Sequence, residues 1–226
     1  KTTDLQNWTG SSVEWGVPSS TGAVVSATNS EAFVTNQVKT VTIGGKTVDF
    51  GSYNCYAWVS AYGGNYNIDG NMWAPDIIYN PVMKKWCMYL SLNGPKWNSA
   101  IILLTADSPD GKFVYQGPVV FTGFYSSASV KYTDTDAPLA THTTTMPPRY
   151  NQTNWGNYWP HAIDPCVFYD ENGKLWMSYG SWSGGIWMLE LDENTGLRDY
   201  DVTYTSDFPT KMQNVTSDPY FGKKIG

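Results

Sequence analysis

The amino-acid sequence predicts an all-β protein made of repeated sheets, and three observations lead to this fold class. Aromatic residues make up 15% of the 226 residues and charged residues only 15%. Long amphipathic helices need Glu, Lys and Arg on their solvent-facing side, so this composition disfavours them. The 21 glycines and 13 prolines supply many turns between short apolar runs. The third observation is an internal repeat.

The strands follow from apolar runs bounded by turn residues. The first expected hairpin joins residues 40–43 to 46–50 through the tight turn Gly44-Gly45. A turn cluster at 107–111 and another at 192–196 each end an apolar run. No helix of ten residues is expected. The further expected strands are 77–79, 85–91, 100–105, 165–169, 174–181 and 185–191.

The repeat relates residues 74–91 to residues 164–181 without a gap. Each copy is followed by a third apolar strand and an Asp-rich turn, so each unit is a sheet of at least three strands. Sheets repeated around one axis form a β-propeller, whereas a β-sandwich would not require a repeating register. The identical pairs are Pro75/Pro165, Tyr79/Tyr169, Lys84/Lys174, Trp86/Trp176, Tyr89/Tyr179 and Ser91/Ser181.

Charge and hydropathy exclude two kinds of partner. The formal net charge is 14 − 20 = −6, and affinity for nucleic acid would need clustered Lys and Arg. No apolar stretch approaches the roughly 20 residues of a membrane span. Cys87 and Cys166 lie inside apolar runs, so buried thiols are expected. Long polar insertions at 9–36 and 125–158 are functional or mobile loops.

Several motifs together resemble glycoside hydrolase family 43, most closely its arabinanase and arabinofuranosidase branch. The resemblance covers nearly the whole chain and is weakest in the insertions. It implies a five-bladed propeller with the active site on the axis, and an inverting mechanism with an Asp base, an Asp that raises the pKa of the acid, and a Glu acid. The motifs are 73–77 (WAPDI), 161–165 (HAIDP), 103–111 (LLTADSPDG), 179–186 (YGSWSGGI) and 191–197 (LDENTGL).

Against that family, the chain is expected to hold the end of blade 1, blades 2 and 3 and the start of blade 4. Residues 1–226 would form one domain, truncated at both ends. The base would precede Lys1, and the acid would follow a segment like 218–225. The remaining blades would come from the rest of the protein or from a second chain or fragment. These 226 residues alone are expected to be inactive.

Asp164 matches the Asp that modulates the pKa of the acid. Inversion needs one carboxylate to activate water and one carboxylic acid to protonate the leaving oxygen. A neighbouring negative charge keeps that acid protonated near neutral pH. The counterpart of Asp164 in the repeat is Ala74, so the blade architecture does not require this carboxylate. The alternative is that Asp164 only shapes a turn or caps a strand before Pro165.

The remaining site residues are expected to bind substrate. Trp73 resembles a substrate-stacking aromatic, and the alternative for Asp76 is hydrogen bonding within the sheet. His161 stands where arabinanases often carry Asn. Glu190 and Glu193 are expected at solvated positions. The full expected substrate-binding set is Trp73, Asp76, Trp159, His161, Ser181 and Trp182.

The resemblance implies a function, a substrate and a location. The function is hydrolysis of α-1,5-linked L-arabinan in plant cell-wall degradation, by a secreted or periplasmic enzyme that takes arabinan or arabino-oligosaccharides. The alternatives are a β-xylosidase, an arabinoxylan arabinofuranosidase, a non-catalytic sugar-binding propeller, or a propeller for protein partners. No His/Cys/Asp cluster has metal-ligand spacing. The resemblance implies calcium on the axis, held through a His of the last blade.

Overall fold

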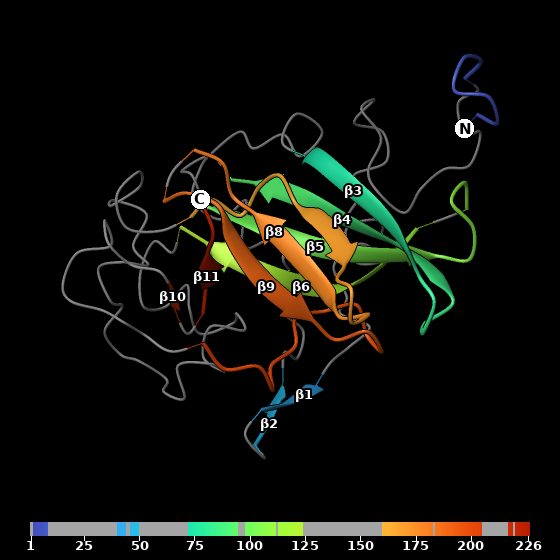
Figure 1. The fold of residues 1–226 in the computed structure, drawn as a ribbon. Helices are drawn as coiled ribbons and strands as arrows, with labels where there is room; N and C mark the ends of the chain where they lie inside the picture. The colour runs from blue at the N-terminus through green and yellow to red at the C-terminus, as the bar shows by residue number, and fades with distance from the viewer. Residues whose placement is uncertain are drawn as a thin grey trace, which may run out of the picture.

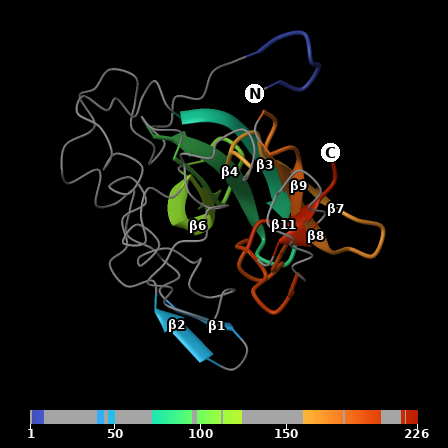
Figure 2. The same cartoon turned by 90° about the vertical axis from the view of Figure 1, so that its left-hand side faces the viewer.

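The computed structural model describes residues 2–8, 40–43, 46–49, 72–94, 98–111, 113–123, 160–182, 184–204, 217–218 and 220–226. In these ranges every regular element is a β-strand, which confirms the all-β class. The two long insertions and Trp159 lie outside the described residues. The expected first hairpin is confirmed as β1 (Thr40–Ile43) and β2 (Lys46–Asp49), and it stands apart from the other strands (Figure 2).

The first large sheet is antiparallel, with the strand order β3-β4-β5-β6 (Figure 1). Every residue of β5 is buried, because its run of Ile and Leu has apolar neighbours on both faces of the sheet. The fourth strand, β6, was not predicted from the sequence. The bounds are β3 (Met72–Asn80), β4 (Lys85–Asn93), β5 (Ser99–Ala106) and β6 (Val114–Thr122).

The second large sheet repeats this antiparallel arrangement, with the order β10-β11-β9-β8-β7. Its strands β7 and β8 correspond to the second copy of the sequence repeat, so the prediction of repeated sheets is confirmed. A closed ring of five such sheets stays a prediction. The bounds are β7 (Cys166–Tyr169), β8 (Leu175–Tyr179), β9 (Trp187–Leu191), β10 (Ser217–Asp218) and β11 (Gly222–Lys224).

The two ends of the chain differ from the expected blade assignment. β11 pairs with β9 through Lys223 and Met188, so it is an outer strand of the second sheet and not the start of a fourth blade. Gly222 permits this approach, since a Cβ atom there would lie 2.3 Å from the carbonyl oxygen of Met188. Residues 2–8 form bends without a strand, so they do not show the expected end of blade 1.

The repeat reappears in the backbone conformation. Ala74 and Asp164 occupy equivalent positions, and both are left-handed, with φ of 43° and 53°. The pairing register nevertheless differs, because Trp86 lies opposite Tyr79 whereas Trp176 lies opposite Phe168. The gapless sequence alignment therefore conceals a difference of one residue between the two hairpins.

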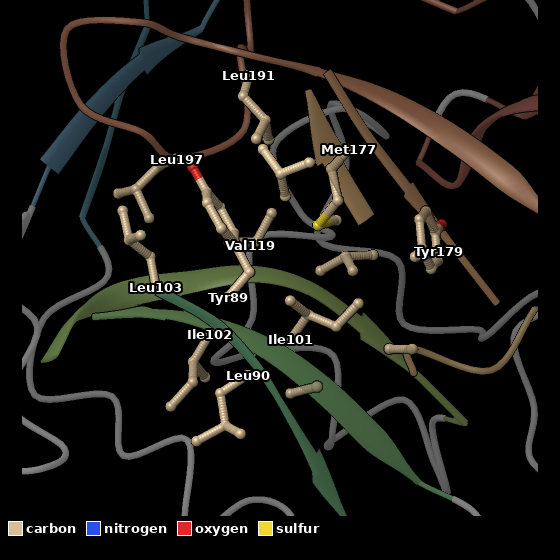
Figure 3. Close-up of a cluster of buried hydrophobic side chains, with 14 of the residues drawn as sticks. Tyr89, Leu90, Ile101, Ile102, Leu103, Val119, Met177, Tyr179, Leu191 and Leu197 are labelled. Atoms are coloured by element: carbon tan, nitrogen blue, oxygen red, sulfur yellow. The ribbon is translucent and has the colours of Figure 1, made fainter. Parts of the chain in front are cut away.

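The main core lies between the two sheets (Figure 3). Tyr89, Leu103 and Val119 of the first sheet point toward Met177 and Leu191 of the second, and all five side chains are buried. The hydroxyl group of Tyr89 donates to the carbonyl oxygen of Gly196 (2.7 Å), which satisfies this polar atom inside the core. Burial of these apolar groups is the main force that joins the sheets.

One expectation about burial, that for Cys166, needs correction. Trp86 and Trp176 of the repeat are both half-buried, and Trp86 packs against the core. Cys87 is buried, and this burial raises the pKa of its thiol to about 12. Cys166 is exposed because β7 alternates between its faces and residue 166 falls on the exposed one.

Candidate functional site

Asp164 lies immediately before β7 with an exposed side chain and a left-handed backbone. A following proline disfavours this conformation, so the surroundings of Asp164 and Pro165 must impose it. Within the described residues no hydrogen bond to the Asp164 carboxylate is found. This carboxylate therefore does not cap the turn or strand that it precedes.

Asp76 has both carboxylate oxygens on backbone amides. Oδ1 accepts from its neighbour Ile77 (2.9 Å), and Oδ2 accepts from Val167 at the start of β7 (2.6 Å). The second bond crosses from the first sheet to the second. Asp76 thus holds two strands together, which agrees with its sheet-bonding alternative.

Trp73 is exposed at the start of β3. The pairing of β3 with β4 shifts between Trp73 and Asp76, at the left-handed Ala74. Such an irregularity re-aims the side chains around it. The Trp73 side chain is 46% exposed although β3 pairs along its length with a buried strand.

Ser181 and Trp182 are exposed because β8 ends earlier than its counterpart β4. Ser91, which the repeat aligns with Ser181, is fully buried inside β4. In the second sheet Gly180 has φ of 88° and turns the chain away from the sheet. Trp182 is consequently 81% exposed.

His161 is buried at the same end of the second sheet. Burial lowers the pKa of its imidazole to about 4, and the charge of Asp164 opposes this shift. The imidazole is therefore neutral at pH 7, in a position from which it can donate or accept a hydrogen bond.

This buried histidine predicts a loss of stability in mild acid. An unfolded histidine has a pKa of 6.5 and the folded one about 4, so between these values only the unfolded state binds the proton. The contribution of His161 is complete above pH 6.5 and falls as the pH drops, and the loss amounts to about 3 kcal/mol at pH 4. Urea unfolding at pH 7.5 and pH 4.5 measures it, with His161→Asn as the control that cannot titrate. A difference between the two proteins that does not change with pH would contradict this prediction.

Hydrogen bonds bring most of the predicted site residues to one region. The amide of Gly180, just before Ser181, donates to the carbonyl oxygen of Ile163, just before Asp164 (2.8 Å). The Asp76–Val167 bond brings the start of β3 next to the start of β7. Six predicted site residues therefore lie around the beginnings of β3 and β7: Trp73, Asp76, His161, Asp164, Ser181 and Trp182.

Other carboxylates take structural roles. Glu190, expected to be solvated, is buried and forms an ion pair with Lys174, because the turn before β8 brings this lysine next to β9. Asp4 accepts hydrogen bonds from the amides of Gln6 and Asn7, which hold the pKa of Asp4 below its ordinary value. Neither carboxylate is available as an acid or a base.

The calcium ion that the family resemblance implies stays a prediction. No three His, Cys, Asp or Glu side chains among them come together in a way that could hold a metal. The same part of the chain contains no helix that is long and apolar enough to cross a membrane.

Comparisons with known proteins identify arabinanases as relatives. No family model matches the chain. The extracellular endo-α-(1→5)-L-arabinanase of Thermotoga petrophila is 34% identical over 127 residues, which are 56% of this chain and 24% of the relative. Extracellular endo-α-(1→5)-L-arabinanase 2 of Bacillus subtilis is 30% identical over 125 residues, which are 55% of this chain and 22% of the relative. The chain thus spans about a quarter of these relatives.

Solved structures of the same kind align with the model. A family 43 glycoside hydrolase from Bacillus licheniformis has 28% identity and a TM-score of 0.45, over 68% of this chain and 26% of that one. The endo-1,5-α-L-arabinanase of Thermotoga petrophila has 30% identity and the same TM-score, over 68% and 27%. The sequence similarity to these arabinanases, over more than half of the chain's length, confirms the resemblance to the arabinanases of glycoside hydrolase family 43 that the sequence motifs indicated.

Proposed function

We propose that the protein containing this chain hydrolyses α-1,5-linked L-arabinan with inversion. The observation that carries the proposal is Asp164, an exposed carboxylate on a left-handed backbone where the equivalent residue of the first sheet is Ala74. Strained backbone at a polar exposed residue is typical of functional sites. The relatives are extracellular arabinanases, which supports this substrate and a secreted or periplasmic location.

Asp164 acts in this mechanism through its charge. A carboxylate beside a general acid raises the pKa of that acid, so the acid keeps its proton near neutral pH. The acid then protonates the leaving oxygen while a separate carboxylate activates water on the opposite face of the sugar, about 6.5–9.5 Å away. We place that base and that acid outside these 226 residues, so the chain by itself does not turn over.

The exposed indoles supply the sugar-binding surface. Trp73 and Trp182 each present an aromatic face, which suits the apolar face of a furanose ring, and Ser181 adds a hydroxyl group beside Trp182. The neutral, buried His161 contributes a hydrogen bond and no charge. We give Asp76 a structural role, since both of its oxygens accept hydrogen bonds from backbone amides.

Product analysis tests the proposal. The full-length protein is incubated with linear α-1,5-arabinan, arabinoxylan and xylo-oligosaccharides, and the products and their anomeric configuration are followed by chromatography and NMR. We expect arabinose or short arabino-oligosaccharides of inverted configuration from arabinan alone. Release of xylose would identify a β-xylosidase, and release of arabinose from arabinoxylan alone an arabinofuranosidase. Binding of arabinan without cleavage would identify a sugar-binding propeller.

A further inference from the structure

We propose that the first sheet positions Asp164, through a clamp made of the side chains of Asp76, Ser99 and Thr122. The clamp holds residues 162 and 167, which flank Asp164 on either side. These three residues are positioning residues, because they act on Asp164 through the backbone that carries it. The inference rests on the proposed role of Asp164 in hydrolysis.

The upstream side of the clamp holds Ala162. Its amide donates to the hydroxyl oxygens of Thr122 (2.9 Å) and Ser99 (3.1 Å), which lie on the adjacent strands β6 and β5. The two hydroxyl groups are also 3.0 Å apart and bonded to each other. All three residues are buried, where an unpaired amide would cost about 1–3 kcal/mol.

The downstream side holds Val167. Its amide donates to Asp76 Oδ2 at 2.6 Å, a bond strengthened by the charge of the carboxylate. Asp76 is itself fixed, since its other oxygen accepts from the amide of Ile77. Between the two clamped amides the chain contains Pro165, which removes a further donor and limits rotation of the backbone.

Comparison of the two repeat units shows that the second unit lacks the carboxylate acceptor of the clamp. The counterpart of Asp76 in the second sheet is Cys166, whose exposed side chain is no carboxylate acceptor. The counterpart of Asp164 in the first sheet is Ala74. The acceptor Asp76 thus belongs to the first unit, and the carboxylate that it positions, Asp164, belongs to the second. Neither unit carries both carboxylates. The packing of the two sheets alone would not require that the units differ at these two positions.

Loss of the clamp is expected to move Asp164 and leave the sheets intact. In Asp76→Asn the side chain keeps its shape, but its NH2 group must face one of the two backbone amides that donate to the carboxylate. Two donors then face each other, and one hydrogen bond is lost. We expect a fall in kcat of about 10- to 100-fold, since small displacements of a reacting group have effects of this size. The pH–rate profile should also lose activity at a lower pH, because a displaced Asp164 raises the pKa of the acid less.

The test uses the full-length protein and a matched control. Asp218 is also buried and accepts two backbone amides, those of Tyr220 (2.7 Å) and Phe221 (2.8 Å), outside the clamp. Asp218→Asn therefore reproduces the chemical change elsewhere. Thr122→Val is paired in the same way with Thr105→Val, whose hydroxyl group accepts from Gln116 (2.9 Å).

Two readouts separate the clamp from general stability. Amide hydrogen exchange of residues 161–169 should accelerate in Asp76→Asn and Thr122→Val and stay unchanged in the two controls. The alkaline limb of the pH–rate profile should move only in the clamp variants, whereas a loss of folded protein lowers the whole profile without moving it. His161, the buried titratable group beside Asp164, is neutral in this pH range and does not contribute to the shift.

Each negative outcome has its own meaning. Equal exchange in the clamp and control variants would overturn the clamp, whether or not the protein is an arabinanase. Faster exchange with an unchanged pH profile and kcat would overturn the positioning role. If the wild-type protein does not cleave arabinan, the proposed function fails, and hydrogen exchange still decides whether the clamp exists.

Discussion

Replacing Asp164 by Asn in the full-length protein is expected to remove most of its turnover on linear α-1,5-arabinan without lowering its Tm. Asn has the size of Asp and tolerates the left-handed conformation at this position, where φ is 53°. It carries no charge, so the general acid loses the neighbour that keeps it protonated. We expect kcat to fall about 100- to 10,000-fold, the range of a lost acid–base contribution.

A second variant separates the charge of Asp164 from its backbone conformation. Asp164→Ala also removes the charge, but alanine lacks the polar group that eases the left-handed conformation, which costs roughly 1–2 kcal/mol. Both variants should have the same low kcat. Only the Ala variant should unfold at a lower denaturant concentration than the wild-type protein. An Asn variant that keeps more than a third of the wild-type rate would show that Asp164 has only a conformational role.

Replacing Gly180 by Ala is expected to destabilise the fold more than any exposed glycine substitution. Gly180 has φ of 88°, and a Cβ atom there would lie 2.6 Å from the carbonyl oxygen of Gly185. The oxygen belongs to the backbone and the position of a Cβ atom is fixed by the backbone, so neither can move aside by a rotamer change. We expect a loss of about 3 kcal/mol in the free energy of unfolding, together with displacement of Trp182.

Gly173 is the matched control for this effect. Its φ of 82° is nearly the same, but nothing lies within 4 Å of the position that a Cβ atom would take. Gly173→Ala should cost only the conformational strain, about 1 kcal/mol. Denaturant unfolding monitored by tryptophan fluorescence measures both variants. Equal losses would show that the contact with Gly185 is relieved without cost.

The sequence predicted the strands whose pattern is local. The hairpins β3–β4 and β7–β8 each combine an apolar run with a turn, so the necessary information lies within about twenty residues. β11 was assigned wrongly because its partner Met188 lies on a distant strand, and a short Gly-Lys-Lys segment has no strand pattern. Similarly, Glu190 forms its ion pair with Lys174, which lies in the turn before β8 and 16 residues away in the sequence.

The sequence predicted the carboxylate of the candidate site but not the residues that hold it in place. Asp164 stood out because the repeat places Ala74 at the same position, and this contrast is visible in one sequence. Ser99 and Thr122 could not be predicted from the sequence. A hydroxyl group on a strand is common, and the amide of Ala162 that donates to both lies far away in the sequence. Trp159 lies outside the described residues, so its expected contact with substrate stays a prediction.

The bonds that cross from one sheet to the next also define which piece of this protein could be inherited as a unit. A duplication or recombination that moved only residues 160–204 would transfer Asp164 but leave Asp76 and Thr122 behind. The transplanted sheet would keep its strands and lose the acceptors that flank its carboxylate. Two consecutive sheets, and not one repeat, are therefore the smallest segment that keeps Asp164 together with the acceptors that flank it.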